Sequence, residues 1–231
     1  MTRSTRRRPV LAAALAVLVF GAYARESQAG KEVGEFDALN LFIEFNSTDN
    51  DAGIQLFLDS DPWETLTIRD PSGKKILSIK ASGGLGELGL TELFFEGGEP
   101  SPAEVLAAFS EGEYEVEART IEGEVLVGTA DLSHEFLAAS LFSPSGGAVV
   151  DRNNTVVTWD AVTGAVAYEV IVESEDLGIS MTFRVPASTS PLSLPLPPAL
   201  LLPNTEYDIE VLAIGTNGNK TITESNFVTG P

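Results

Sequence analysis

The chain has 231 residues, no cysteine, and 34 acidic against 14 basic residues, which gives a net charge of −20. The absence of cysteine excludes disulfides, thiolate metal sites and an acylated lipoprotein anchor. The negative charge argues against nucleic acid and anionic lipid as partners, because both would be repelled.

Residues 1–29 have the pattern of a cleaved secretory signal peptide. An arginine-rich start precedes the apolar run Val10–Ala22, and small residues suited to cleavage follow at 22–24 and 27–29. The apolar run is too short to span a bilayer, so we expect no stable membrane insertion after cleavage. The pattern predicts an exported protein, extracellular or periplasmic, and leaves the general secretory and twin-arginine routes open.

Residues 30–136 are predicted to form an immunoglobulin-like β-sandwich. Short runs with strand-like alternation are separated by turn signals such as those at 49–53, 59–62 and 70–73. The predicted strands are 39–46, 53–59, 64–68, 75–80, 91–95, 113–120 and 124–130. One helix is expected after Ser101, because Ser101-Pro102-Ala103-Glu104 combines an N-cap, a proline at the first helical position and a capping-box glutamate.

A second β-sandwich is predicted over residues 146–231, after a linker at 137–145. Its clearest motif is Leu201–Ala213, where a turn leads into a strand with alternating apolar residues. Such an entry is typical of a tyrosine corner, in which the ring of Tyr207 lies in the core and its hydroxyl bonds a backbone group upstream. The sequence therefore predicts an all-β protein built of two tandem β-sandwiches after the signal peptide.

The second half also carries a family pattern. Its parts, in chain order, are TVVTWD at 155–160, GAVAYEV at 164–170, the tyrosine corner, GNKT at 218–221 and NFVTG at 226–230. In this order and spacing, residues of about 142–230 resemble a fibronectin type III domain over its whole length. The resemblance implies that Trp159 is the core tryptophan of the second strand, faced by Tyr168, Val170 and Val172 from the third.

The candidate metal ligands are Asp49, Asp51, Asp59 and Asp61, in two acidic stretches one strand apart. Calcium takes six to eight oxygen ligands, which these side chains and nearby carbonyls would supply if the two stretches converge. Aspartates also build turns through their own side-chain hydrogen bonds, and the EF-hand pattern is not matched. No other cofactor is expected, so calcium is the one candidate ligand.

Other motifs have structural interpretations. Gly84–Gly89 matches G-x-G-x-x-G but precedes too short a run for a dinucleotide-binding helix. His134, the only histidine, is expected to be an exposed linker residue, and Glu111 to Glu117 at alternate positions a solvated strand face. Trp63 is expected in the core, and the prolines at 195–198 between strands.

No catalytic set emerges from these residues, so no enzyme activity is predicted. The sequence favours a secreted or periplasmic binding, adhesion or spacer protein whose partner is an unidentified protein or glycan. The alternative is an accessory carbohydrate-binding protein or a hydrolase associated with polysaccharide degradation. The oligomeric state is left open.

Overall fold

The computed structural model describes residues 33–231, so the predicted signal peptide at residues 1–29 lies outside the described residues. The described residues belong to one compact unit, Lys31–Pro231, that holds two β-sandwiches in sequence, each with its own hydrophobic core. Within this part of the chain, no helix has the length and apolar character needed to cross a bilayer.

The first sandwich contains seven strands and two short helices. The strands are β1 (Val33–Gly34), β2 (Ala38–Asn46), β3 (Asp51–Arg69), β4 (Lys75–Lys80), β5 (Leu90–Glu96), β6 (Gly112–Thr120) and β7 (Val125–Leu132). The helices are α1 (Gly84–Leu88) and α2 (Pro102–Ala108). The predicted helix after Ser101 is confirmed: the Glu104 carboxylate accepts hydrogen bonds from the Ser101 backbone N–H and hydroxyl.

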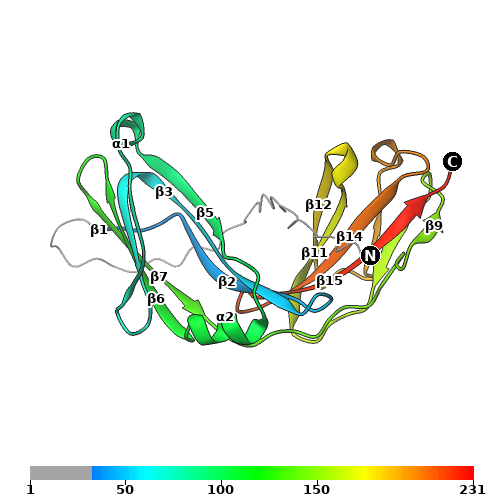
Figure 1. The fold of residues 1–231 in the computed structure, drawn as a ribbon, viewed down its shortest axis with the longest axis horizontal. Coiled ribbons are helices and arrows are strands. Elements are labelled where there is room, and N and C mark those ends of the chain that lie inside the picture. The colour runs from blue at the N-terminus through cyan, green and yellow to red at the C-terminus, as the bar shows by residue number, and fades with distance from the viewer. Residues whose placement is uncertain (1–32) are drawn as a thin grey trace, which may run out of the picture. The chain divides into compact units, whose positions relative to one another are not determined.

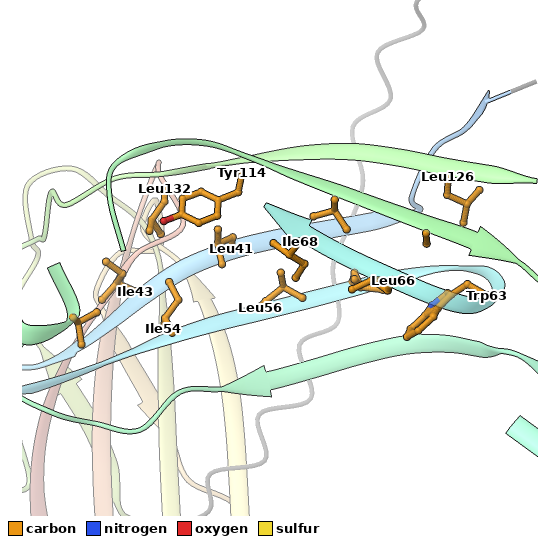
Figure 2. Packing of buried hydrophobic residues seen from close by; sticks show 14 of the residues in the cluster. Leu41, Ile43, Ile54, Leu56, Trp63, Leu66, Ile68, Tyr114, Leu126 and Leu132 are labelled. Carbon is orange, nitrogen blue, oxygen red and sulfur yellow. The ribbon is translucent and has the colours of Figure 1, made fainter. Parts of the chain in front are cut away.

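Strand β3 belongs to both layers of the first sandwich. Its first half pairs with β2 and β5, and its second half pairs with β4 and β6. The pairing register shifts between Asp59 and Thr65, and Trp63 lies at this bend, fully buried (Figure 2). The prediction of two strands separated by a turn at 59–62 was therefore wrong. Apolar side chains at Leu58 and Trp63 keep the chain in the core as it passes from one layer to the other.

The second sandwich also has two layers. One contains β12 (Ile179–Pro186), β11 (Ala165–Ser174), β14 (Glu206–Gly215) and β15 (Lys220–Thr229), with β9 (Ala148–Val150) beside β15 (Figure 1). The other contains β13 (Ser193–Pro195), β10 (Val156–Trp159) and β8 (Phe142–Ser143). Two 3₁₀ turns, η1 (Glu175–Leu177) and η2 (Pro198–Leu200), connect strands.

The tyrosine corner is present as predicted. The Tyr207 hydroxyl accepts a hydrogen bond from the Leu202 N–H at 2.8 Å and donates one to the Leu200 carbonyl at 3.3 Å. Tyr207 is fully buried, and its ring stacks on Phe227. The side chains of Ile209, Val211 and Ala213 lie in the same core, which confirms the predicted alternation.

The tryptophan placement implied by the resemblance is also confirmed. Trp159 is buried, and its ring meets Tyr168 edge-on with centroids 5.7 Å apart. Pro195 ends β13, Pro197 follows it and Pro198 begins η2, in the connection that leads to the corner.

Candidate functional site: the junction between the sandwiches

The four predicted metal ligands are not brought together. Asp49 lies in the turn between β2 and β3, and Asp51 begins β3. Asp59 lies eight residues farther along the same strand, about 26 Å away at roughly 3.3 Å per residue, and Asp61 follows at the bend. Among residues 33–231, no group of three or more acidic, histidine or cysteine side chains has the arrangement of a metal site.

Asp49 and Asp51 lie instead where the two sandwiches meet. Strand β2 pairs in parallel with β15, with Glu44 opposite Lys220 and Asn46 opposite Ile222. The turn after β2 extends this contact, because the Ser47 backbone N–H and hydroxyl both donate to the Ile222 carbonyl. The junction is therefore made of backbone pairing as well as side chains.

Asn219 connects three segments at this junction. Its side-chain oxygen accepts a hydrogen bond from the Ile43 N–H at 2.9 Å, and its amide nitrogen donates to the carbonyls of Ser133 and Glu135. The side chain is almost fully buried. Because every one of its partners belongs to the first sandwich or to the segment that follows it, Asn219 ties the β14–β15 hairpin to the preceding domain.

Lys220 supplies the positive charge of the junction. Its ammonium lies 3.0 Å from a Glu169 oxygen and 3.3 Å from a Glu44 oxygen, and it sits over the ring of Phe42. Burial would lower the pKa of Lys220, but Glu44 and Glu169 outweigh it and raise that pKa. Arg184 gives Glu169 a second cation at 2.8 Å.

Carboxylates on both sandwiches surround these ion pairs. Burial raises the pKa of Glu210 to about 8, with Glu224 and Glu44 adding like charge. Burial likewise raises the pKa of Glu224 to about 7, with Asp49 and Asp51 adding to it. The pKa values of Asp51, Glu96 and Glu99 are also raised, first by burial and then by their acidic neighbours.

A second feature lies beside the bend of β3, next to Pro62. Helix α1 carries Leu85 and Leu88, which are 57% and 75% exposed, and Ile121 in the β6–β7 turn is 41% exposed. At the end of α1, Gly89 has a positive φ of 78°, and a Cβ there would lie 2.6 Å from Pro62 and 3.1 Å from Ile121. Glycine at this position therefore lets α1 lie against Ile121. We call Leu85, Leu88 and Ile121 the apolar tip.

The remaining sequence candidates have structural roles. The G-x-G-x-x-G stretch forms the five-residue α1 and leads directly into β5. Glu111, Glu113, Glu115 and Glu117 are exposed, as expected. His134 differs from expectation: it is half-buried, and its Nε2 lies 2.7 Å from the Phe109 carbonyl, so it holds the end of α2 against the segment after β7.

Sequence reasoning did not identify Asn219, Lys220, Glu44 and Glu169 as members of one site. Each lies on a different strand or loop, and the parallel β2–β15 pairing that unites them links residues about 175 positions apart. One signal was available. Lys220 is a lone basic residue within a strand of a strongly acidic chain, and a buried lysine requires carboxylate partners.

No protein-family model matches the chain. No curated protein matches it either. Solved structures that match include the chicken CNTN1 FN1–FN3 domains, at 12% identity and a TM-score of 0.37 over 86% of this chain and 65% of that one. A two-domain fibronectin type III segment of chicken tenascin matches at 15% identity and a TM-score of 0.32, over 84% and 99% of the two chains.

A tetra-tandem repeat from the extending region of a large adhesion protein also matches, at 15% identity and a TM-score of 0.28, over 83% of this chain and 49% of that one.

Proposed function

We propose that this chain is an exported, non-catalytic protein that binds a protein partner through the apolar tip, with its two sandwiches as the scaffold. The observation that carries this proposal is the exposure of Leu85 and Leu88 on a single helical turn between glycines. Two leucines exposed to water beside a third apolar residue, Ile121, do not stabilise the fold. A partner that covers them would gain free energy from their burial, so such a patch is typical of a binding surface.

The charge around the tip indicates the chemistry of the partner. Glu87 lies on α1 with the two leucines, and Glu122 and Glu124 lie in the same turn as Ile121. A complementary surface has an apolar depression bordered by lysine or arginine, because opposite charges at a rim steer association. A protein partner fits this description.

The accessory carbohydrate-binding alternative receives less support. Glycan sites are commonly built on exposed aromatic rings. Among residues 33–231, Trp63 and Trp159 are core residues and Tyr114, Tyr168 and Tyr207 are buried as well, whereas Phe94 on β5 is an exposed aromatic ring. The exposed side chains at the tip are aliphatic, which suits a protein contact.

The test compares the protein with a Leu85→Ser/Leu88→Ser variant for binding to proteins of the native cell surface and secreted fraction. Leu141→Ser is the matched control, because Leu141 is also highly exposed but lies in the segment before β8. We expect the double variant to lose binding at least tenfold, the control to keep it, and binding to weaken with added salt. Equal binding by all three proteins contradicts a role for the tip, and retention on polysaccharide supports the alternative instead.

Export is proposed from the N-terminal pattern alone, and N-terminal sequencing of the protein outside the cytoplasm tests it. Cleavage after Ala24 or Ala29 is expected. An intact Met1 on a membrane-embedded product contradicts export by cleavage.

A further inference from the structure

The outer face of the larger sheet in the second sandwich brings carboxylates into register. Since Tyr207, Ile209 and Val211 point into the core, Asp208 and Glu210 point outward from β14. Glu210 lies opposite Glu224 on β15, and Asp208 lies opposite Glu173 on β11. Like charges directly opposite each other on one face repel, so this face is unfavourable when every group is ionised.

The first sandwich adds to the same cluster. The Asn46 side chain donates a hydrogen bond of 2.6 Å to a Glu224 oxygen, and the Glu224 N–H donates to the Thr48 hydroxyl at 2.9 Å. These bonds hold the β2–β3 turn, with Asp49 and Asp51, against Glu224. Acidic groups that face Glu210 and Glu224 thus come from β2, the β2–β3 turn, β3, the segment after β5, β11 and β14; they are Glu44, Asp49, Asp51, Glu99, Glu173 and Asp208.

The nearby cations are already engaged. In the described part of the chain, the ion pairs of this face join Lys220 to Glu44 and Glu169, and Arg184 to Glu169. None of them reaches Glu210 or Glu224. Glu210 and Glu224 are therefore partly buried beside other carboxylates without a cation of their own, at the point where the two sandwiches touch.

The physical consequence is proton binding near neutral pH. The pKa of Glu210 is about 8 and that of Glu224 about 7, both raised from 4.5 first by burial and then by like charge. Between pH 4.5 and 8 the folded junction thus holds more protons than separated strands would. Because stability falls with rising pH wherever the folded state binds more protons, the contribution of these groups is present at low pH and is lost as pH rises towards 8.

We propose that the junction is a pH-sensitive contact, in which protonation of the Glu210–Glu224 pair holds β2 against β15 and ionisation loosens this pairing. The β2–β15 contact is the part of the structure expected to open when these carboxylates ionise. Only three register pairs connect β2 to β15, from Lys220–Glu44 to Ile222–Asn46, whereas nine connect β14 to β15. A repulsion at Glu224, just beyond the last pair, therefore opens the short contact before the long one.

The experiment measures hydrogen exchange of backbone amides at pH 6 and pH 9, expressed as protection factors relative to intrinsic exchange. The β2–β15 contact is read at the amide of Ser47 and at neighbouring amides. We expect their protection factors to fall at least about tenfold from pH 6 to pH 9, because a pKa that differs by one unit between the closed and open junction changes the opening equilibrium tenfold. Amides in the centre of β6, such as Val116, and in the β14–β15 ladder report whether each sandwich stays folded. Their protection is expected to stay unchanged.

Two variants assign the effect to its residues. Glu210→Gln/Glu224→Gln keeps the size of both side chains and removes their charge, so its junction is expected to stay protected at pH 9. Glu113→Gln/Glu117→Gln removes two charges from the exposed face of β6 and should keep the pH dependence of the unmodified protein. Flat protection between pH 6 and 9 overturns the proposal. So does an unchanged pH dependence in the first variant, its loss in the second, or an equal loss of protection in the β14–β15 ladder.

Discussion

The two sandwiches solve the same packing problem with different sequence devices. Each buries one tryptophan, Trp63 or Trp159, and each anchors a buried tyrosine hydroxyl to backbone upstream in the chain. Both contacts are local, to Ser110 four residues before Tyr114 and to Leu200 seven residues before Tyr207, but the second lies in a motif that can be recognised in the sequence. The first sandwich depends on one 19-residue strand that changes layers at Trp63. Local motifs therefore define the second fold, and a long-range crossing defines the first.

The sharpest way to test this comparison is to empty each tryptophan site. Trp63→Ala and Trp159→Ala should each lower the free energy of unfolding by about 3–5 kcal/mol, because removing a large buried side chain leaves a cavity in the core. Trp159→Ala should reduce amide protection in the second core and leave the first folded. Trp63→Ala should loosen both layers of the first sandwich at once, since β3 serves both. Denaturant unfolding with residue-resolved hydrogen exchange provides both measurements.

Phe94→Ala is the control for this pair, because Phe94 is an exposed aromatic side chain on β5. Its effect should stay within about 0.5 kcal/mol. An unchanged second core in Trp159→Ala would rule out Trp159 as its centre. If Trp63→Ala reduces amide protection in only one layer of the first sandwich, the bend in β3 does not couple the two layers.

The tyrosine hydroxyls give a smaller and finer contrast. Tyr207 makes two hydrogen bonds to backbone, whereas Tyr114 makes one, to the Ser110 carbonyl at 3.0 Å. Tyr207→Phe should therefore cost about 1–2 kcal/mol, because it leaves the Leu202 N–H without its partner. Tyr114→Phe should cost about 1 kcal/mol or less. Thermal unfolding of both variants compares them, and a larger loss in Tyr114→Phe would reverse the ranking of the two tyrosines.

The same contrast explains which parts of the fold could be predicted. Alternation and turn residues were enough to identify β2, β4, β5, β6 and β7 to within about two residues, and the capping box identified α2. The layer change in β3 could not be predicted. Asp59, Ser60 and Pro62 form a typical turn signal, and only the tertiary burial of Trp63 keeps the chain extended there.

The candidate site was less accessible to sequence reasoning. Asp49 and Asp51 were identified from their acidity, but their neighbours Glu224 and Glu99 come from distant segments. The β2–β15 pairing that gathers them rests on three register pairs and on Asn219, whose role depends on carbonyls of residues 133 and 135. Every residue type has a backbone carbonyl, so the residues that accept hydrogen bonds from Asn219 cannot be recognised by their type. No sequence pattern therefore marks such a contact.

A further contrast concerns calcium, because the structure divides the predicted ligands into two pairs. Asp49 and Asp51 lie at the acidic junction, and Asp59 and Asp61 lie along β3 towards its bend.

Extracellular calcium sites have dissociation constants of about 0.1–1 mM. At ten times such a constant, calcium would add about 1.4 kcal/mol to the free energy of unfolding. Any such gain should disappear in Asp49→Asn/Asp51→Asn and persist in Asp59→Asn/Asp61→Asn, because the first pair lies beside both Glu99 and Glu224. Calorimetric titration with calcium, and with magnesium at matched ionic strength, separates binding from charge screening. Equal gains from both metals would leave these aspartates as turn and strand residues, and loss of the gain in the second variant would mean that the two pairs act together after all.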